Sequence, residues 1–400
     1  MHAEFVESTP HHGGRVAQGF EEVRVEFERN FSERGEIGAA VAAYWRGGKV
    51  VDLWDGRRTL SGDAPWNEDT LVVVNSTTKG LAAMTVAVAN SRGWIDYEAP
   101  VAQYWPEFAQ HGKGAVTVRQ LLSHEAGLVW IDDPLRPQDM RDLDHVSLAL
   151  ARQKPAWEPG TRHGYHAMTI GLYMQELIRH VDPAHRTLGR FFAEEIAKPL
   201  EIEFYVGLPP EVPDERLAQL RLFSPMRAIR ALPSVPKGYV MRILWPWSLL
   251  RKSMLFADLD PTMPHARGRD PGRQRRGDGA GHRASLLGVR GRRSGARHHP
   301  GDAREPHRGQ RPRASEGRGN GCAQLDVARL PPTGTAARLG LESACLQGTP
   351  GAGGSFGFAD PDARLGFAYV MNNMEFHMFD DPREKALRDA VHRSIRRLSG

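Results

Sequence analysis

Near each end of the chain, a stretch with apolar residues at helical spacing lies next to a stretch in which apolar and polar residues alternate. Residues 15–34 carry apolar side chains at helical spacing and predict an amphipathic helix. Residues 37–56 alternate around Gly47-Gly48, which predicts a β-hairpin, and residues 353–372 alternate around a turn at Asp360-Pro361-Asp362. A C-terminal amphipathic helix, opened by Asp381-Pro382, follows this second hairpin.

The middle of the chain has helical spacing instead. Asn75 is expected to cap a helix running from Ser76 to about Asn90, with Gly93 behind it. Thr117 is expected to cap the next helix, which Gly127 would stop. Further helices are expected at 167–181 and 188–200, after a loop at 157–166. The predicted fold class is therefore α+β: an antiparallel sheet from both termini, flanked by helices, with an inserted, mainly helical lobe.

Composition excludes a membrane-spanning protein and a disulfide-rich one. No apolar run reaches the roughly 18–20 residues of a membrane span, and the nearest, residues 239–250, contains Arg242 and Pro246. The N-terminus shows no basic start followed by an apolar stretch, so no secretory signal is expected. Two cysteines give no disulfide framework. A cytoplasmic location is expected.

The positive charge is confined to one segment. The chain has a net charge of +5, yet residues 265–320 alone hold 15 Arg against 5 Asp or Glu. Residues 265–348 are rich in Arg, Gly and Pro and stand apart from a domain predicted at 15–264 and 349–399. Three interpretations remain: a disordered linker, a nucleic-acid-binding arm, or an out-of-frame reading between two compensating frame slips. The arm lacks aromatic residues for base stacking, so no nucleic-acid partner is expected.

Ser76 and Lys79 are the first candidates for catalysis. A serine hydroxyl is a poor nucleophile until a base removes its proton, and an uncharged lysine amine is such a base. Spacing i, i+3 on a helix places both side chains on one face. The helix N-terminus adds free N–H groups that stabilise a developing oxyanion. Taken alone, S-x-x-K also occurs by chance.

Three further motifs follow in order. They are "QLLSHEAGL" at 120–128, "WEPGTRHGYHAMT" at 157–169 and "GTPGAGGSFGFADPD" at 348–362. With "NSTTKGLAAM" they resemble the serine β-lactamase/DD-peptidase superfamily, above all its β-lactamase-like family VIII carboxylesterases. The resemblance implies a serine esterase acting on small-molecule esters through an acyl-enzyme, with no cofactor.

The resemblance also assigns roles to particular residues. Ser76 matches the nucleophile, Lys79 the base or proton shuttle, and Tyr165 the tyrosine of the second motif. Backbone N–H groups of Ser76 and Ala352 match the oxyanion hole.

The third motif matches Thr349-Pro350-Gly351 on a strand. That strand begins with a lysine, histidine or tryptophan in much of the superfamily. Its replacement by Thr349 argues against recognition of a substrate carboxylate, as penicillins require.

Alternatives remain open. A β-lactamase or DD-peptidase is the rival within the enzymes, and a catalytically impaired or non-enzymatic member is the rival outside them. His124 is a weak candidate for a catalytic base, because the resemblance gives its motif a structural role. No His, Cys, Asp or Glu cluster has the spacing of a metal site.

Overall fold

The computed structural model describes residues 5–6, 13–133, 135, 139–223, 238, 241–242, 245, 248–254, 286–291, 347–377 and 380–400. Most of the Arg-rich segment 265–348 therefore lies outside the described residues, as do both cysteines and much of the apolar stretch 239–250. None of the described helices has both the length and the apolar character needed to cross a bilayer.

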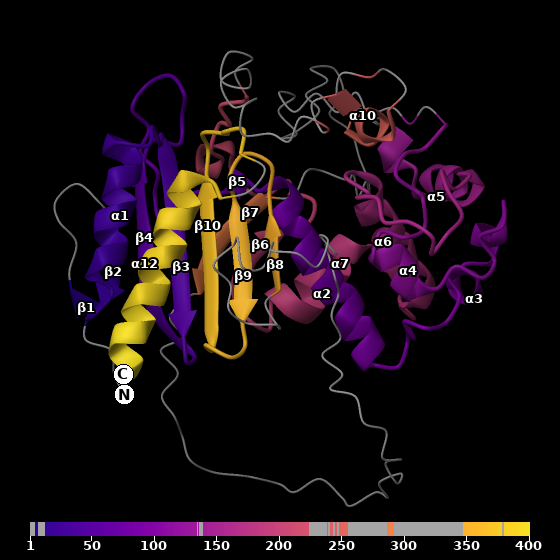
Figure 1. Cartoon of the computed structure of the whole chain (residues 1–400), viewed down its shortest axis with the longest axis horizontal. Helices are drawn as coiled ribbons and strands as arrows, with labels where there is room; N and C mark the ends of the chain where they lie inside the picture. Colours follow the sequence, from indigo (N-terminus) through magenta and orange to yellow (C-terminus); the bar gives the residue numbers. More distant parts are fainter. Residues whose placement is uncertain are drawn as a thin grey trace, which may run out of the picture.

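A seven-stranded antiparallel sheet joins the two ends of the chain (Figure 1). Its strand order is β1-β2-β4-β3-β10-β9-β8. The central strands β3 and β10 pair along seven residues, from Leu365 opposite Trp45 to Met371 opposite Ala39. The strands are β1 (Phe5–Val6), β2 (Gly13–Ala17), β3 (Gly38–Trp45), β4 (Gly48–Gly56), β8 (Gln347–Pro350), β9 (Phe356–Asp360) and β10 (Leu365–Met371).

Helices α1 (Glu21–Ser32) and α12 (Pro382–Ser399) lie side by side over one face of this sheet (Figure 1). Alternate residues of β3, including Val41, are buried against Phe27 and Leu387 of the two helices. The opposite face is covered as well, because Ala40 and Val370 pack with residues of a second core. The sheet is thus buried on both sides and forms a rigid frame.

The helical lobe lies beyond the β8 edge of the sheet (Figure 1). Its core gathers apolar residues such as Val86, Trp105 and Tyr173, all almost fully buried. The helices with α-helical geometry are α2 (Thr78–Ser91), α3 (Val101–Tyr104), α4 (Val118–Leu122), α5 (Leu143–Arg152), α6 (Thr169–Val181), α7 (Leu188–Phe192) and α10 (Leu249–Met254). Short 3-10 turns are η1 (Asn75–Thr77), η2 (Pro106–Ala109), η3 (Asp139–Arg141) and η5 (Asp214–Arg216), and η4 (Ala193–Ala197) is a π-helical turn.

A second, three-stranded sheet has the order β5-β7-β6. Strands β5 (Val72–Val73) and β6 (Ile202–Tyr205) both pair with β7 (Leu286–Gly291). Strand β7 belongs to the Arg-rich segment. Strand β5 leads directly into η1 and α2, so this small sheet anchors the start of the helix that carries Lys79.

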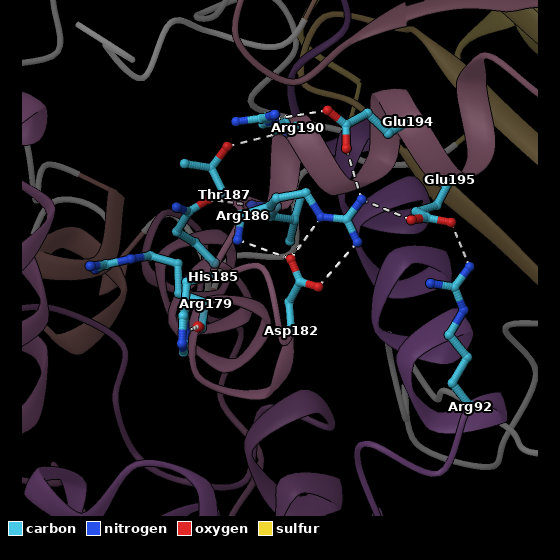
Figure 2. Close-up of polar contacts among 11 residues, drawn as sticks. Arg92, Arg179, Asp182, His185, Arg186, Thr187, Arg190, Glu194 and Glu195 are labelled. Atoms are coloured by element: carbon cyan, nitrogen blue, oxygen red, sulfur yellow. Dashed lines mark hydrogen bonds and ion pairs between the residues drawn. The ribbon is translucent and has the colours of Figure 1, made fainter. Parts of the chain in front are cut away.

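An ion-pair network ties three parts of the helical lobe together (Figure 2). The guanidinium of Arg186 binds Asp182, at the end of α6, and both Glu194 and Glu195 of the η4 turn. Glu195 also pairs with Arg92, the residue that follows α2. The network therefore fixes the far end of α2 against the rest of the lobe.

The structure confirms most predicted elements and corrects others. The helix predicted over 15–34 begins at Glu21, and residues 15–17 belong to β2, because Gly19 adopts a left-handed φ of 88° and breaks the pattern. Asn75 does not cap a helix with its side chain. Its own φ is 49°, and α2 starts only at Thr78. The cap at Thr117 is confirmed and forms a capping box with Gln120, although its helix ends at Leu122 instead of reaching Gly127.

Candidate active site

Ser76 and Lys79 meet where β5 turns into α2. Val72 and Val74 are fully buried and fix the approach of the chain, and Ser76 then lies in the 3-10 turn η1. Lys79 stands in the first turn of α2, and its Nζ donates a hydrogen bond to Ser76 Oγ at 2.8 Å. The S-x-x-K spacing therefore brings the hydroxyl and the amine into direct contact.

Tyr165 reaches the same place from the loop before α6. The Nζ of Lys79 lies 5.2 Å from the centre of the Tyr165 ring, a distance at which a cation is attracted to an aromatic face. Tyr165 is 37% exposed, so its ring borders solvent. Ser76, Lys79 and Tyr165 thus come together from two distant parts of the chain.

His124 is hydrogen-bonded to the loop that carries Tyr165. Its main-chain carbonyl accepts the N–H of Gly164 at 3.0 Å, and its Nδ1 accepts the N–H of His166 at 3.1 Å. The residues on both sides of Tyr165 are therefore bonded to one histidine. The His124 ring also packs against Tyr165, with 5.1 Å between ring centres.

The burial of His124 argues against a role as catalytic base. Burial, with the nearby His166, Lys79 and His163, holds the pKa of His124 well below its usual range. Burial likewise lowers the pKa of His166 to about 3. Both rings are neutral near neutral pH, and the Nδ1 of His124 already accepts a main-chain hydrogen bond. The arrangement favours the structural role expected for this motif.

Strand β8, which carries Thr349 and Pro350, lies against η1 and α2. Gly351 follows it and lies so close to η1 that a Cβ there would be 2.1 Å from Ser355 Oγ and 2.3 Å from the Val74 carbonyl oxygen. Ser355 Oγ donates to the same Val74 carbonyl at 2.9 Å. Only glycine permits this approach, which packs the third motif directly against the turn that carries Ser76.

The loop after Gly351 is held from two sides. Asn75 Nδ2 donates to the main-chain carbonyl of Ala352 at 2.8 Å. Arg383, which is 1% exposed, donates from Nη2 to the carbonyl of Gly353 at 3.0 Å and pairs with Asp381 and Glu36. The loop is thereby joined to η1 and to α12.

The amides of Ser76 and Ala352 are available as donors. Within the ranges that the structure describes, neither amide makes a hydrogen bond to a protein acceptor. Free backbone amides of this kind can stabilise a negatively charged oxygen. No group of three or more His, Cys, Asp or Glu residues in those ranges is arranged to hold a metal ion.

Three supporting residues were not foreseen in these roles: Asn75, Ser355 and Arg383. A polar residue directly before the serine, and a serine directly after "GAGG", are the only local signals for the first two. The burial of Arg383 has no local signal, because a charged residue at the start of an amphipathic helix is usually exposed.

Several known proteins are similar to this chain in sequence. A family model described as Beta-lactamase matches residues 26–392. LipL, described as an esterase/beta-lactamase of Mycobacterium tuberculosis (strain ATCC 25618 / H37Rv), is 39% identical over 199 residues, which are 48% of this chain and 44% of that protein. EstB, an esterase of Burkholderia gladioli, is 31% identical over 157 residues, which are 35% of this chain and 40% of EstB. The matched part spans less than half the length of each of these two relatives.

Solved structures match over almost the whole chain. A penicillin-binding protein homolog from Caulobacter crescentus is 25% identical with a TM-score of 0.67, and covers 96% of this chain and 99% of its own. A family VIII carboxylesterase is 27% identical with a TM-score of 0.64 and the same coverage. EstA from Arthrobacter nitroguajacolicus Rue61a is 26% identical with a TM-score of 0.66, and covers 100% of both chains. The chain has the α+β fold of the β-lactamase/DD-peptidase type, and it belongs to the beta-lactamase family of serine hydrolases, which includes carboxylesterases.

Proposed function

We propose that the protein cleaves carboxylic esters through an acyl-enzyme formed on Ser76. The observation that carries this proposal is the 2.8 Å contact between Lys79 Nζ and Ser76 Oγ, beside the ring of Tyr165. A nucleophile within hydrogen-bond reach of a possible base is the geometry that covalent catalysis requires. Similarity to LipL and to a family VIII carboxylesterase supports the same chemistry.

In the proposed reaction, Ser76 Oγ attacks the ester carbonyl while its proton passes to the amine of Lys79. The amides of Ser76 and Ala352 hold the oxyanion of the tetrahedral intermediate. Its collapse breaks the bond to the alcohol, which leaves with the proton relayed by Lys79 and Tyr165. Water then attacks the acyl-enzyme with the same groups reversed, and the carboxylic acid is released.

We further propose that residues 15–264 and 349–399 form one hydrolase domain. Strands from both parts belong to one large sheet, in which β3 of the first part pairs with β10 of the second, and the family match runs across the segment between them. We propose a small uncharged ester as the substrate, because the Thr349 side chain carries no positive charge that could bind a substrate carboxylate.

A β-lactamase is the second candidate, since the beta-lactamase of Escherichia coli (strain K12) is 25% identical over 175 residues.

Hydrolysis of p-nitrophenyl acetate and butyrate tests the proposal. The wild type should release p-nitrophenol, and Ser76→Ala should reduce kcat by at least about 10³-fold. Ser91→Ala is the matched control, because Ser91 lies on the last turn of α2 and its hydroxyl donates to the local Val88 carbonyl. Equal turnover by wild type and Ser76→Ala would refute the proposal. Ser76-dependent turnover of nitrocefin, with inert esters, would favour the β-lactamase.

A further inference from the structure

Asn75 has a backbone conformation that few residue types adopt. Its φ is 49°, and it stands between Val74, which is fully buried, and Ser76. Among residues other than glycine, asparagine, aspartate and histidine are enriched in this left-handed region. Backbone strain of this kind persists where the surrounding structure enforces it, often beside a functional group. The left-handed turn at Asn75 sets the direction in which Ser76 leaves β5.

The side chain of Asn75 makes a second, independent contact. Its Nδ2 donates to the carbonyl of Ala352 at 2.8 Å, across 277 positions of sequence. Glycine would allow the same backbone but could not donate this hydrogen bond. Aspartate would allow the backbone too, but an ionised carboxylate is only an acceptor. Asparagine therefore meets both requirements of this position: the left-handed backbone and a side chain that donates a hydrogen bond.

The neighbours of Ala352 are held by other groups. Gly351 donates its N–H to the Ser355 carbonyl at 2.7 Å, and the carbonyl of Gly353 accepts from Arg383. Among the described residues, Ala352 itself is held by Asn75. Asn75 is thus covalently joined to one proposed oxyanion donor, Ser76, and hydrogen-bonded to the residue that carries the other.

We propose that Asn75 is a positioning residue that fixes the Ala352 amide relative to the Ser76 amide in the oxyanion hole. This inference rests on the proposed function, because it concerns the same acyl transfer. Two amides stabilise an oxyanion only when both point at the same oxygen. The Gly351 carbonyl accepts the N–H of Gly354 at 3.2 Å, so loss of the Asn75 amide frees the peptide plane between Ala352 and Gly353. Ala352 can then rotate, and the transition state loses stabilisation while ester binding in the ground state does not.

Asn75→Gly and Asn75→Asp separate the hydrogen bond from the backbone strain, because both keep access to the left-handed conformation. Asn90→Asp is the matched control: Asn90 Nδ2 likewise donates to a carbonyl, that of Ile95 at 2.6 Å, but at the opposite end of α2. Each full-length variant is assayed for kcat and KM with p-nitrophenyl butyrate and for its melting temperature. Inhibition by phenylboronic acid is added, because a boronate bonded to the serine mimics the tetrahedral intermediate.

Both Asn75 variants should lose about 10-fold or more in kcat, with KM within about twofold. Their affinity for the boronate should weaken by a similar factor, and Asn90→Asp should change neither value. Wild-type kcat and boronate affinity in Asn75→Gly and Asn75→Asp would overturn the inference while leaving the esterase proposal intact. A wild type without Ser76-dependent turnover would refute the esterase proposal and this inference with it.

Discussion

Lys79 Nζ lies 2.8 Å from Ser76 Oγ, at the point where the three-stranded sheet passes into α2. The two residues are close in sequence, but the groups that surround them come from distant parts of the chain. The Tyr165 loop comes from the helical lobe, and strand β8 comes from the C-terminal part of the chain. The proposed catalysis at this contact therefore depends on how firmly the lobe and the sheet are held together.

Removal of the Tyr165 hydroxyl should reduce turnover without destabilising the fold. Tyr165→Phe keeps the ring that packs on His124 and Lys79. We expect kcat for p-nitrophenyl butyrate to fall about 10²-fold, the usual size of a lost proton-transfer group, with the melting temperature unchanged. Tyr173→Phe is the control: its buried hydroxyl bonds the Leu150 carbonyl, so its loss should cost about 1 kcal/mol of stability and leave kcat alone. Equal kcat in Tyr165→Phe and wild type would remove Tyr165 from the mechanism.

A methyl group at Gly351 should disrupt the site. In Gly351→Ala, the added carbon would meet Ser355 Oγ and the Val74 carbonyl at 2.1 and 2.3 Å, so β8 would have to move away from η1. We expect a loss of about 2 kcal/mol in the free energy of unfolding and at least a 10²-fold fall in kcat/KM. At Gly366, in β10, a Cβ meets nothing within 4 Å. Gly366→Ala should therefore behave as wild type, and equal behaviour of both variants would contradict the close approach.

The Arg186 network (Figure 2) should contribute to stability and not to the chemical step. Asp182 is 1% exposed, so Arg186→Ala leaves a buried carboxylate without its charged partner. We expect the free energy of unfolding to fall by about 3 kcal/mol, with kcat per folded molecule unchanged. Arg190 also pairs with Glu194 but is 69% exposed, and Arg190→Ala should cost less than about 1 kcal/mol. Urea denaturation distinguishes the two, and equal losses would show that burial of the pair is unimportant.

The buried His166 should make stability depend on pH. Its pKa falls from 6.5 to about 3 on folding, because burial disfavours the charged ring. Between these values the unfolded chain binds a proton that the folded chain does not, so the free energy of unfolding decreases as the pH falls from 6.5 towards 3. One such site contributes a slope of about 1.4 kcal/mol per pH unit.

His166→Gln should reduce this slope by that amount. The Gln Oε1 can replace His166 Nε2, which accepts the N–H of Leu128 at 3.3 Å, so the fold should be kept. Urea denaturation between pH 4 and pH 6.5 measures the slope in both proteins. Identical slopes would show that His166 does not titrate in this way.

The parts of the structure predicted correctly depend on local pattern. The strands are predicted from the alternation of apolar and polar residues at 37–56 and 353–372. Helix α12 is predicted from Asp381-Pro382 before an amphipathic stretch. Neither prediction needs information from the rest of the chain. The conformation of Asn75 could not be predicted, because it is coupled to a carbonyl 277 residues away. The burial of Arg383 among Glu36 and Asp381 likewise depends on contact between the two ends of the chain.

Within the candidate site, the same distinction holds. Spacing alone brought Ser76 and Lys79 onto one turn of chain, and resemblance alone pointed to Tyr165 and Ala352. That His124 holds both neighbours of Tyr165 follows from its left-handed φ of 63° and from the fold of the loop 157–166. Neither of these is encoded in the short motif "LLSHEAGL".

Covalent labelling tests the central claim most directly. The wild type, Ser76→Ala and Lys79→Met are incubated with a fluorophosphonate, and the adduct is located by mass spectrometry of the intact chain and its peptides. Lys49→Met is the matched control, because Lys49 makes a similar i, i+3 contact, to Asp52 at 2.7 Å, on β4. We predict one adduct, on Ser76, in the wild type and in Lys49→Met, none in Ser76→Ala, and labelling at least about 10²-fold slower in Lys79→Met. An unlabelled wild type, or an adduct that persists in Ser76→Ala, would contradict the account.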